Sequence, residues 1–208
     1  MYEKREHMCV VLACMYYAVL VICYFCMGIL YTHGFRYLSL FSWALSVLAV
    51  SIVFYTDHNF KAPGFYGEKT KANLIIACII AAVCSVIGFC FSPLPASKVL
   101  YGIAYYLFYI ALQEEVIFRG FLQSYLFGFH WKKQWLFVLG AAMFSLMHIP
   151  FQMFVYGLVS PAYLLVCWPQ LIFTFCFHLA MCWLTYWRKD ILLPTVLHFA
   201  IDFLQSVL

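Results

Sequence analysis

Charged residues are scarce in this chain of 208 residues: Asp, Glu, Lys and Arg make up 10% of it, against 67% hydrophobic residues. Soluble domains carry about a quarter charged residues, so this chain has too few charges to cover its apolar surface in water. A lipid bilayer solvates such apolar faces. The composition therefore predicts a membrane protein and excludes an ordinary soluble domain.

Other features are missing as well. The sequence shows no internal repeat, no low-complexity tract and no separate soluble domain. Its ten cysteines lie in or beside apolar runs, where Cys acts as a small hydrophobe, so no secreted disulfide framework is implied. A net charge of +4 is too modest to indicate a nucleic-acid partner, and we attribute it to orientation in the membrane.

Polar residues divide the chain into about seven apolar segments, each near the roughly 20 residues that a helix needs to span a bilayer. The first lacks a clear small-x-small cleavage site and is too long for a typical signal peptide, so we interpret it as a spanning helix. An uncharged stretch interrupted by Pro and Gly, Ile149–Pro161, separates the fifth and sixth segments. The segments are Met8–Tyr31, Tyr37–Tyr55, Ala72–Phe91, Val99–Phe127, Gln134–His148, Ala162–Trp187 and Ile191–Leu208.

Basic residues are distributed unevenly between the two sides that seven spans would define. Nine lie on the side of the N-terminus and two, Arg36 and Lys98, on the other. Cytoplasmic loops carry an excess of Lys and Arg. We therefore predict an all-α, polytopic membrane helix bundle of about seven transmembrane helices, in the cell membrane, with a cytoplasmic N-terminus.

A few ionisable residues remain inside the apolar segments. A charge near the bilayer centre costs about 2.5–3.5 kcal/mol on insertion scales, so such residues need partners and indicate a functional site. They are Glu114, Glu115, Arg119, His148, His178, His198 and Asp202.

Glu115 and Arg119 are four residues apart, so they share a helix face with the acid N-terminal to the base, the better orientation for an ion pair. Glu114 is turned about 100° away. The pair therefore has the character of a structural contact, and Glu114 is available for chemistry. The alternative is that all three form one buried ion network between helices.

The histidines differ in their helical neighbours. Phe144 and His148 share a face, which fits either a histidine presented to a site or an interface residue. His198 and Asp202 also share a face, and such a pair can hold an imidazole tautomer, bind a metal or stabilise charge. His178 has no polar helical partner and is interpreted as a packing residue.

The ordered set Glu114-Glu115-x-x-x-Arg119, Phe144-x-x-x-His148 and His198-x-x-x-Asp202 resembles the CPBP family. This family comprises type II CAAX prenyl endopeptidases and bacterial bacteriocin-processing or immunity proteins. The resemblance covers about Val99 to Leu208. It divides the chain into residues 1–98, with three N-terminal spans, and residues 99–208, a CPBP-like catalytic core.

The resemblance implies an intramembrane endopeptidase with a cavity reached from one membrane face. By position, Glu114 would activate water together with His148, and His198 and Asp202 would line the oxyanion side. Glu115 and Arg119 would support the site, as would Phe144.

Asp202 departs from the family pattern, in which this position is often Asn. Asn can donate a hydrogen bond to an oxyanion, whereas ionised Asp cannot. Three roles are then open for Asp202: it is protonated, it orients His198, or it helps to bind a cation. Glu114, His148 and His198 have acceptable ligand types for zinc, but the compact HExxH arrangement is missing, so the cofactor stays open between zinc and a metal-free mechanism.

The expected partners are the lipid bilayer and a peptide or membrane-protein substrate. The short chain favours a bacterial origin, and then a leader, pheromone-precursor or bacteriocin-type peptide over a prenylated CAAX protein. The alternatives are a non-proteolytic bacteriocin-immunity or scaffold membrane protein and, with less support because no repeat is recognisable, a small transporter.

Overall fold

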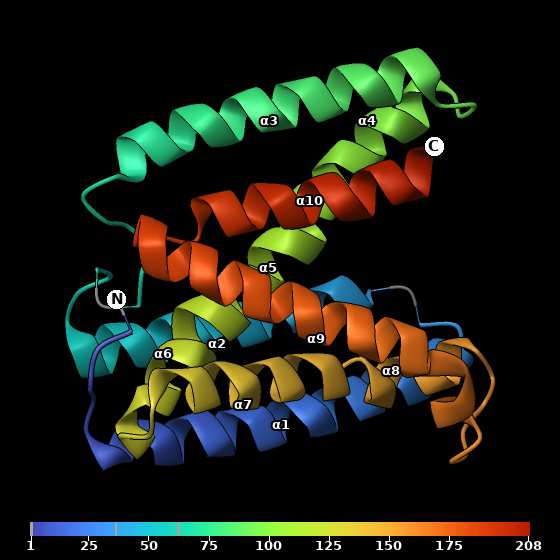
Figure 1. Ribbon diagram of the computed structural model, residues 1–208. Coiled ribbons are helices and arrows are strands. Elements are labelled where there is room, and N and C mark those ends of the chain that lie inside the picture. The colour runs from blue at the N-terminus through green and yellow to red at the C-terminus, as the bar shows by residue number, and fades with distance from the viewer. Residues whose placement is uncertain (1, 36, 62) are drawn as a thin grey trace.

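The computed structural model describes residues 2–35, 37–61 and 63–208, and all regular secondary structure in these ranges is helical. Seven helical segments run back and forth, so that the N- and C-termini lie at opposite ends of the bundle (Figure 1). They are α1 (His7–Thr32), α2 (Leu38–Asp57), α3 (Thr70–Phe91), the continuous segment α4 to η3 (Ala96–Phe129), α7 with α8 (Lys133–Leu146 and Ile149–Val155), α9 (Tyr163–Arg188) and α10 (Leu192–Val207).

Five of these segments are long and apolar enough to cross a membrane: α1, α2, α3, α7 with α8, and α9. The shorter α10 is also apolar, and the segment Ala96–Phe129 has the length of a span. The prediction of an all-α, multi-pass membrane bundle of about seven helices is thus confirmed. Arg36, one of the two basic residues assigned to the side away from the N-terminus, lies outside the described residues.

The prediction for Ile149–Pro161 was wrong in its first half. Residues Ile149–Val155 form helix α8 rather than an interrupted stretch. Pro150 lies in the first turn of this helix, where a backbone N–H has no acceptor within the helix, so a proline costs no hydrogen bond there. Pro150 therefore begins a helix at this point instead of preventing one.

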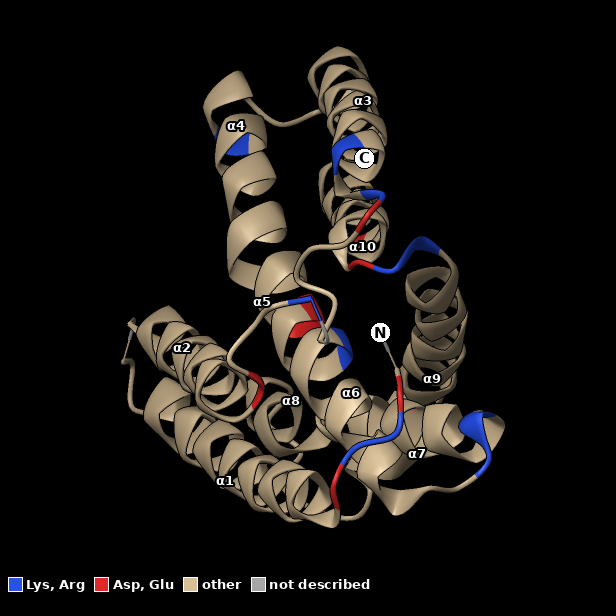
Figure 2. Ribbon diagram, turned by 90° about the vertical axis from the view of Figure 1, so that its left-hand side faces the viewer, with Lys and Arg blue, Asp and Glu red and all other residues tan. Residues whose placement is uncertain are grey.

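The N-terminal helices pack into the same core as the later ones. Leu20 of α1 and Ala49 of α2 are buried with Phe121 and Phe144 from the second half of the chain. A second cluster joins α3 and α4 to Phe199 and Phe203 of α10. Figures 1 and 2 show α3, α4 and α10 gathered on one side of the bundle.

Polar contacts tie the N-terminal segment to one end of the bundle. The Arg5 guanidinium lies 2.6 Å from Asp57 Oδ1 and donates through Nε to Ser124 Oγ at 3.1 Å. Burial lowers the pKa of Arg5, but the hydrogen bonds to Asp57 outweigh it and leave that pKa above its ordinary value. The Tyr2 hydroxyl donates to the carbonyl of Arg119 at 3.1 Å.

We name this end the basic end and define it by residues 2–6, 57–71, 129–133 and 188–192, of which residue 62 is not described. It faces the viewer in Figure 2, which shows most of the Lys and Arg segments there. Asp190 is fully buried at this end and accepts from Asn73 Nδ2 at 2.6 Å. The opposite end comprises residues 32–38, 91–96, 155–163 and 208, of which residue 36 is not described.

Gly128 provides a test of how the N-terminal segment docks. A Cβ added there would lie 2.6 Å from the carbonyl oxygen of Glu6 and 2.8 Å from Val10 Cγ2, so the backbone would have to shift. We expect Gly128→Ala to destabilise the protein by about 1–3 kcal/mol, the usual cost of overpacking. The control is Gly102→Ala, whose Cβ would make ordinary contacts at 3.4 Å or more with Phe203. Thermal unfolding in detergent measures both, and equal stability of the two variants contradicts the docking.

Candidate active site

The segment that carries Glu114 and Glu115 is wound irregularly. It runs as α4 (Ala96–Ala104), η1 (Tyr105–Ala111), α5 (Leu112–Glu114), η2 (Glu115–Leu122), α6 (Gln123–Tyr125) and η3 (Leu126–Phe129), where η1 and η2 are π-helical and η3 is a 3₁₀-helix. π-Helical turns are rare and occur frequently at functional sites. Glu114 and Glu115 thus lie where a short α-helical stretch meets a wider π-turn.

The two glutamates have different surroundings. Glu115 is fully buried and pairs with the equally buried Arg119, as their four-residue spacing predicts. The Arg119 guanidinium lies between two aromatic rings, 5.1 Å from the centroid of Phe144 and 5.2 Å from that of Phe177. The Glu114 side chain is 19% exposed and lines a cavity.

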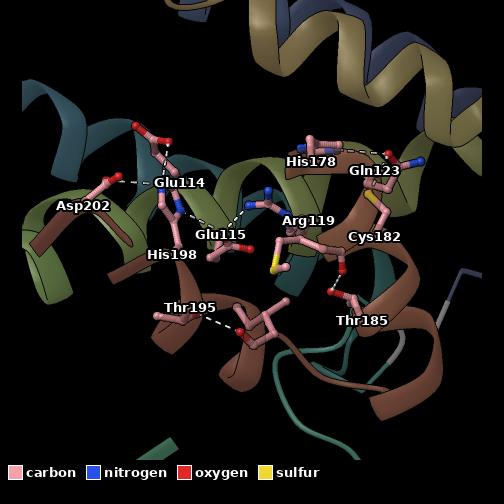
Figure 3. Close-up of polar contacts among 12 residues, drawn as sticks. Glu114, Glu115, Arg119, Gln123, His178, Cys182, Thr185, Thr195, His198 and Asp202 are labelled. Carbon is pink, nitrogen blue, oxygen red and sulfur yellow. Dashed lines mark hydrogen bonds and ion pairs between the residues drawn. The ribbon is translucent and has the colours of Figure 1, made fainter. Parts of the chain in front are cut away.

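His198 connects the two glutamates. Its Nδ1 donates to Glu115 Oε1 at 2.9 Å, and its Nε2 lies 3.4 Å from Asp202 Oδ2 and 3.8 Å from Glu114 Oε2 (Figure 3). With a carboxylate at each ring nitrogen, the imidazole can donate from both. Asp202 therefore faces the side of His198 that Glu115 does not hold.

His148 lies at the break between α7 and α8. Its Nδ1 is 2.9 Å from the carbonyl oxygen of Phe144. A carbonyl only accepts hydrogen bonds, so Nδ1 carries the proton and Nε2 keeps a lone pair in the neutral ring. The Phe144 ring packs edge-on against His148 at 5.1 Å between centroids and lies 6.3 Å from His198. Phe144 therefore fixes the positions of both histidines.

One cavity of about 1000 Å³ brings the four candidate catalytic residues together: Glu114, His148, His198 and Asp202 all line it. They come from α5, the α7–α8 junction and α10, which are far apart in sequence. The arrangement places two carboxylates and two imidazoles around one space. Such a set can remove a proton from a water molecule and stabilise negative charge nearby.

His178 lies behind this cavity rather than in it. It is fully buried, its ring lies tilted against that of Phe144 with 5.0 Å between centroids, and its Nε2 is 3.4 Å from Gln123 Oε1. Its interpretation as a packing residue is thus confirmed.

Comparison with known proteins adds to this geometry. The model of the family described as type II CAAX prenyl endopeptidase Rce1-like matches residues 96–204, slightly more than half of the chain. The chain belongs to this family. No curated protein and no solved structure matches it. The matched region contains Glu114, His148, His198 and Asp202, and membership makes the chain a multi-pass member of a protease family.

Three side chains of this Rce1-like chain are candidate metal ligands. Glu114, His148 and His198 offer suitable atoms, but within the described ranges no three His, Cys, Asp or Glu side chains are grouped so that they could hold a metal ion. As placed, these side chains do not form a three-ligand site. Zinc binding stays a prediction.

Sequence reasoning missed the uncharged polar residues of the Rce1-like cavity. Four glutamines line it, together with Tyr24 and Thr174. The signal was present, because glutamine is unusual in an apolar span and needs a hydrogen-bonding partner there. The four are Gln113, Gln152, Gln170 and Gln205.

The buried Glu115–Arg119 pair predicts an unequal response to substitution. Arg119→Met leaves the Glu115 carboxylate without its cation, and breaking a buried pair costs about 3–5 kcal/mol. The double variant Glu115→Gln/Arg119→Met removes both the carboxylate and the guanidinium charge. It keeps an amide oxygen at position 115 that can accept a hydrogen bond from His198. We therefore expect the double variant to unfold at a higher temperature in detergent than Arg119→Met alone. Additive losses would show that the pair is not energetically coupled.

Proposed function

We propose that the protein is an intramembrane endopeptidase in which Glu114 and His148 activate water to hydrolyse a peptide bond of a membrane-associated peptide or protein. The observation that carries the proposal is the meeting of Glu114, His148, His198 and Asp202 in one cavity. Membership of a protease family supports the same reaction class.

The reaction follows from the positions of these groups. Glu114 takes a proton from a water held between it and the lone pair of His148 Nε2, and the water oxygen attacks the carbonyl carbon of the substrate. The carbonyl oxygen becomes an oxyanion, which a proton on His198 Nε2 stabilises. The protonated Glu114 then delivers its proton to the leaving amine as the C–N bond breaks, which regenerates the site.

Asp202 and Glu115 act on His198 in this scheme. Glu115 holds Nδ1 at 2.9 Å and so directs Nε2 toward the cavity. Asp202, at 3.4 Å from Nε2, supports the positive charge of the imidazolium. Asp202 thus has the role of orienting His198, one of the three roles that its departure from the family pattern left open.

The cavity wall favours an internal peptide bond over a free chain end. None of the described residues that line the cavity is Lys or Arg. A free C-terminal carboxylate needs a cation or a cluster of backbone N–H groups to bind it. Carboxylates at Glu114 and Asp202 would repel such a terminus, so the proposed reaction is endoproteolytic.

Glu114→Gln tests the proposed base. The amide cannot accept the proton from water, and loss of a general base lowers rates by about 10²–10⁴-fold. Cleavage of a membrane-embedded reporter peptide by reconstituted protein measures this. The control is Gln205→Glu, which changes the charge at another residue that lines the same cavity and should leave the fold intact. Undiminished cleavage by Glu114→Gln would exclude the mechanism and favour a binding or immunity role.

Asp202 provides an independent test. Asp202→Asn keeps an oxygen that can accept from His198 and adds an N–H₂ donor near the oxyanion, so we expect it to retain cleavage within about tenfold of the wild type. Asp202→Leu removes the acceptor and should lose about 10²-fold, as removal of an oxyanion-stabilising group does. Equal loss in both variants would show that the negative charge itself is required.

A further inference from the structure

Two of the four glutamines in the cavity lie beside the two residues that activate water in the proposed reaction. Gln113 directly precedes Glu114 in α5. Gln152 lies one helical turn after His148, because its backbone N–H donates to the His148 carbonyl at 3.3 Å. All four side chains line the same cavity. A molecule bound at Glu114 and His148 therefore occupies the space that these two amides help to enclose.

The amide of Gln113 has no hydrogen-bonding partner within the described residues. Gln113 is 3% exposed, and neither its Oε1 nor its Nε2 is paired. It also lines a second, smaller space of about 220 Å³ beside α2, but Ser46 and Ser51 there donate to carbonyls of their own helix. An unpaired buried amide is unfavourable. A molecule bound in the cavity can supply the partner that the protein itself does not.

The amide of Gln152 is held in one orientation. The hydroxyl of Tyr163, the first residue of α9, donates to Gln152 Oε1 at 3.0 Å. Tyr163 is itself 2% exposed, so this contact is buried on the Tyr163 side. With the oxygen engaged, Gln152 keeps its two N–H donors, which no described residue accepts. Gln152 therefore offers donors to a molecule in the cavity.

A peptide backbone has the chemistry that these two amides require. Each peptide group carries one N–H donor and one carbonyl acceptor, and both are costly to leave unpaired in an apolar surrounding. A glutamine side chain carries the same donors and acceptor without charge. In a helix the backbone groups already pair with one another. The groups that remain free for Gln113 and Gln152 are those of an extended segment.

We propose that Gln113 and Gln152 bind the backbone of an extended peptide segment, and that Tyr163 is the positioning residue that orients Gln152. Gln113 uses both its donor and its acceptor, and Gln152 donates to a backbone carbonyl. The identity of the bound segment as the substrate rests on the proposed peptidase function, whereas the binding itself does not. Recognition then depends on the backbone and its conformation more than on the charge of any side chain.

Binding is measured in the full-length Glu114→Gln protein in detergent, where cleavage is expected to be lost. The probe is a capped, fluorescein-labelled peptide of alternating Val and Thr, residues that favour extended structure, and its anisotropy reports binding. Gln113→Met and Gln152→Met should each weaken the affinity by about tenfold, the equivalent of one or two hydrogen bonds. The matched control is Gln134→Met, which is exposed in the first turn of α7. Unchanged affinity in either variant, or no saturable binding of the peptide, overturns the proposal.

A fully N-methylated form of the same peptide tests whether the contact is to the backbone. It lacks the N–H donors that Gln113 Oε1 would accept, so Gln113→Met should weaken its binding less than that of the unmodified peptide. An equal loss with both peptides overturns the backbone contact.

Tyr163→Phe tests the orientation of Gln152. Removal of the hydroxyl should weaken peptide binding where Gln152 is present and have little further effect in Gln152→Met, because the two residues act as a unit. A structural role of Tyr163 alone would lower the affinity equally in both proteins, and that result overturns its assignment as a positioning residue.

Thermal unfolding separates a binding role of Gln113 from a structural one. Replacing an unpaired buried amide by an apolar side chain of similar shape is neutral or stabilising. Gln113→Met without peptide should therefore unfold at the same or a higher temperature than the parent protein, although it binds the peptide more weakly. A clearly lower unfolding temperature shows that the amide has a partner within the protein and overturns the proposal.

The binding assay and the cleavage assay can fail independently. Loss of peptide affinity in both methionine variants, without Glu114-dependent cleavage of the reporter peptide by the wild type, overturns the peptidase and leaves the peptide-binding site. Glu114-dependent cleavage together with unchanged affinities overturns the binding site and leaves the peptidase.

Discussion

The buried carboxylate of Glu115 is the constraint on which the candidate site depends. One oxygen of this carboxylate receives both the Arg119 guanidinium and Nδ1 of His198. It therefore joins the fourth helical segment to α10, which is the last helix of the chain. An isolated charge in the apolar interior is costly, so these three groups stabilise one another. The direction of His198 Nε2 toward the cavity follows from this contact.

Phe144 also connects several residues of the site, through its aromatic ring and its backbone carbonyl. Its ring, 1% exposed, lies against Arg119 and against His148, His178 and His198. Its carbonyl oxygen sets the tautomer of His148 by accepting from Nδ1. A single residue thus contacts the buried Arg119 and positions His148, which lines the same cavity as Glu114.

The spans could be predicted from the sequence because hydropathy and length decide membrane insertion. The helix bounds agree with the predicted segments within a few residues, except that α8 extends the fifth segment from His148 to Val155. The ion pair of Glu115 with Arg119 could also be predicted, since it is local in sequence. The π-helical turns at 105–111 and 115–122 could not, because packing between helices decides them. Helix α8 was missed because Pro150 was interpreted as a break rather than as a first-turn residue.

The depth of the site in the membrane follows from the order of the spans. The order does not decide which sides of the helices face one another. Helices alternate in direction, so a residue early in an even-numbered span and one late in an odd-numbered span lie near the same membrane face. Glu114 lies midway along the fourth segment, His148 at the break between α7 and α8, and Asp202 in the second half of α10. Their common depth was therefore implicit in the sequence. Which sides of the helices face one another depends on packing around Phe144 and Glu115, and only the fold provides that.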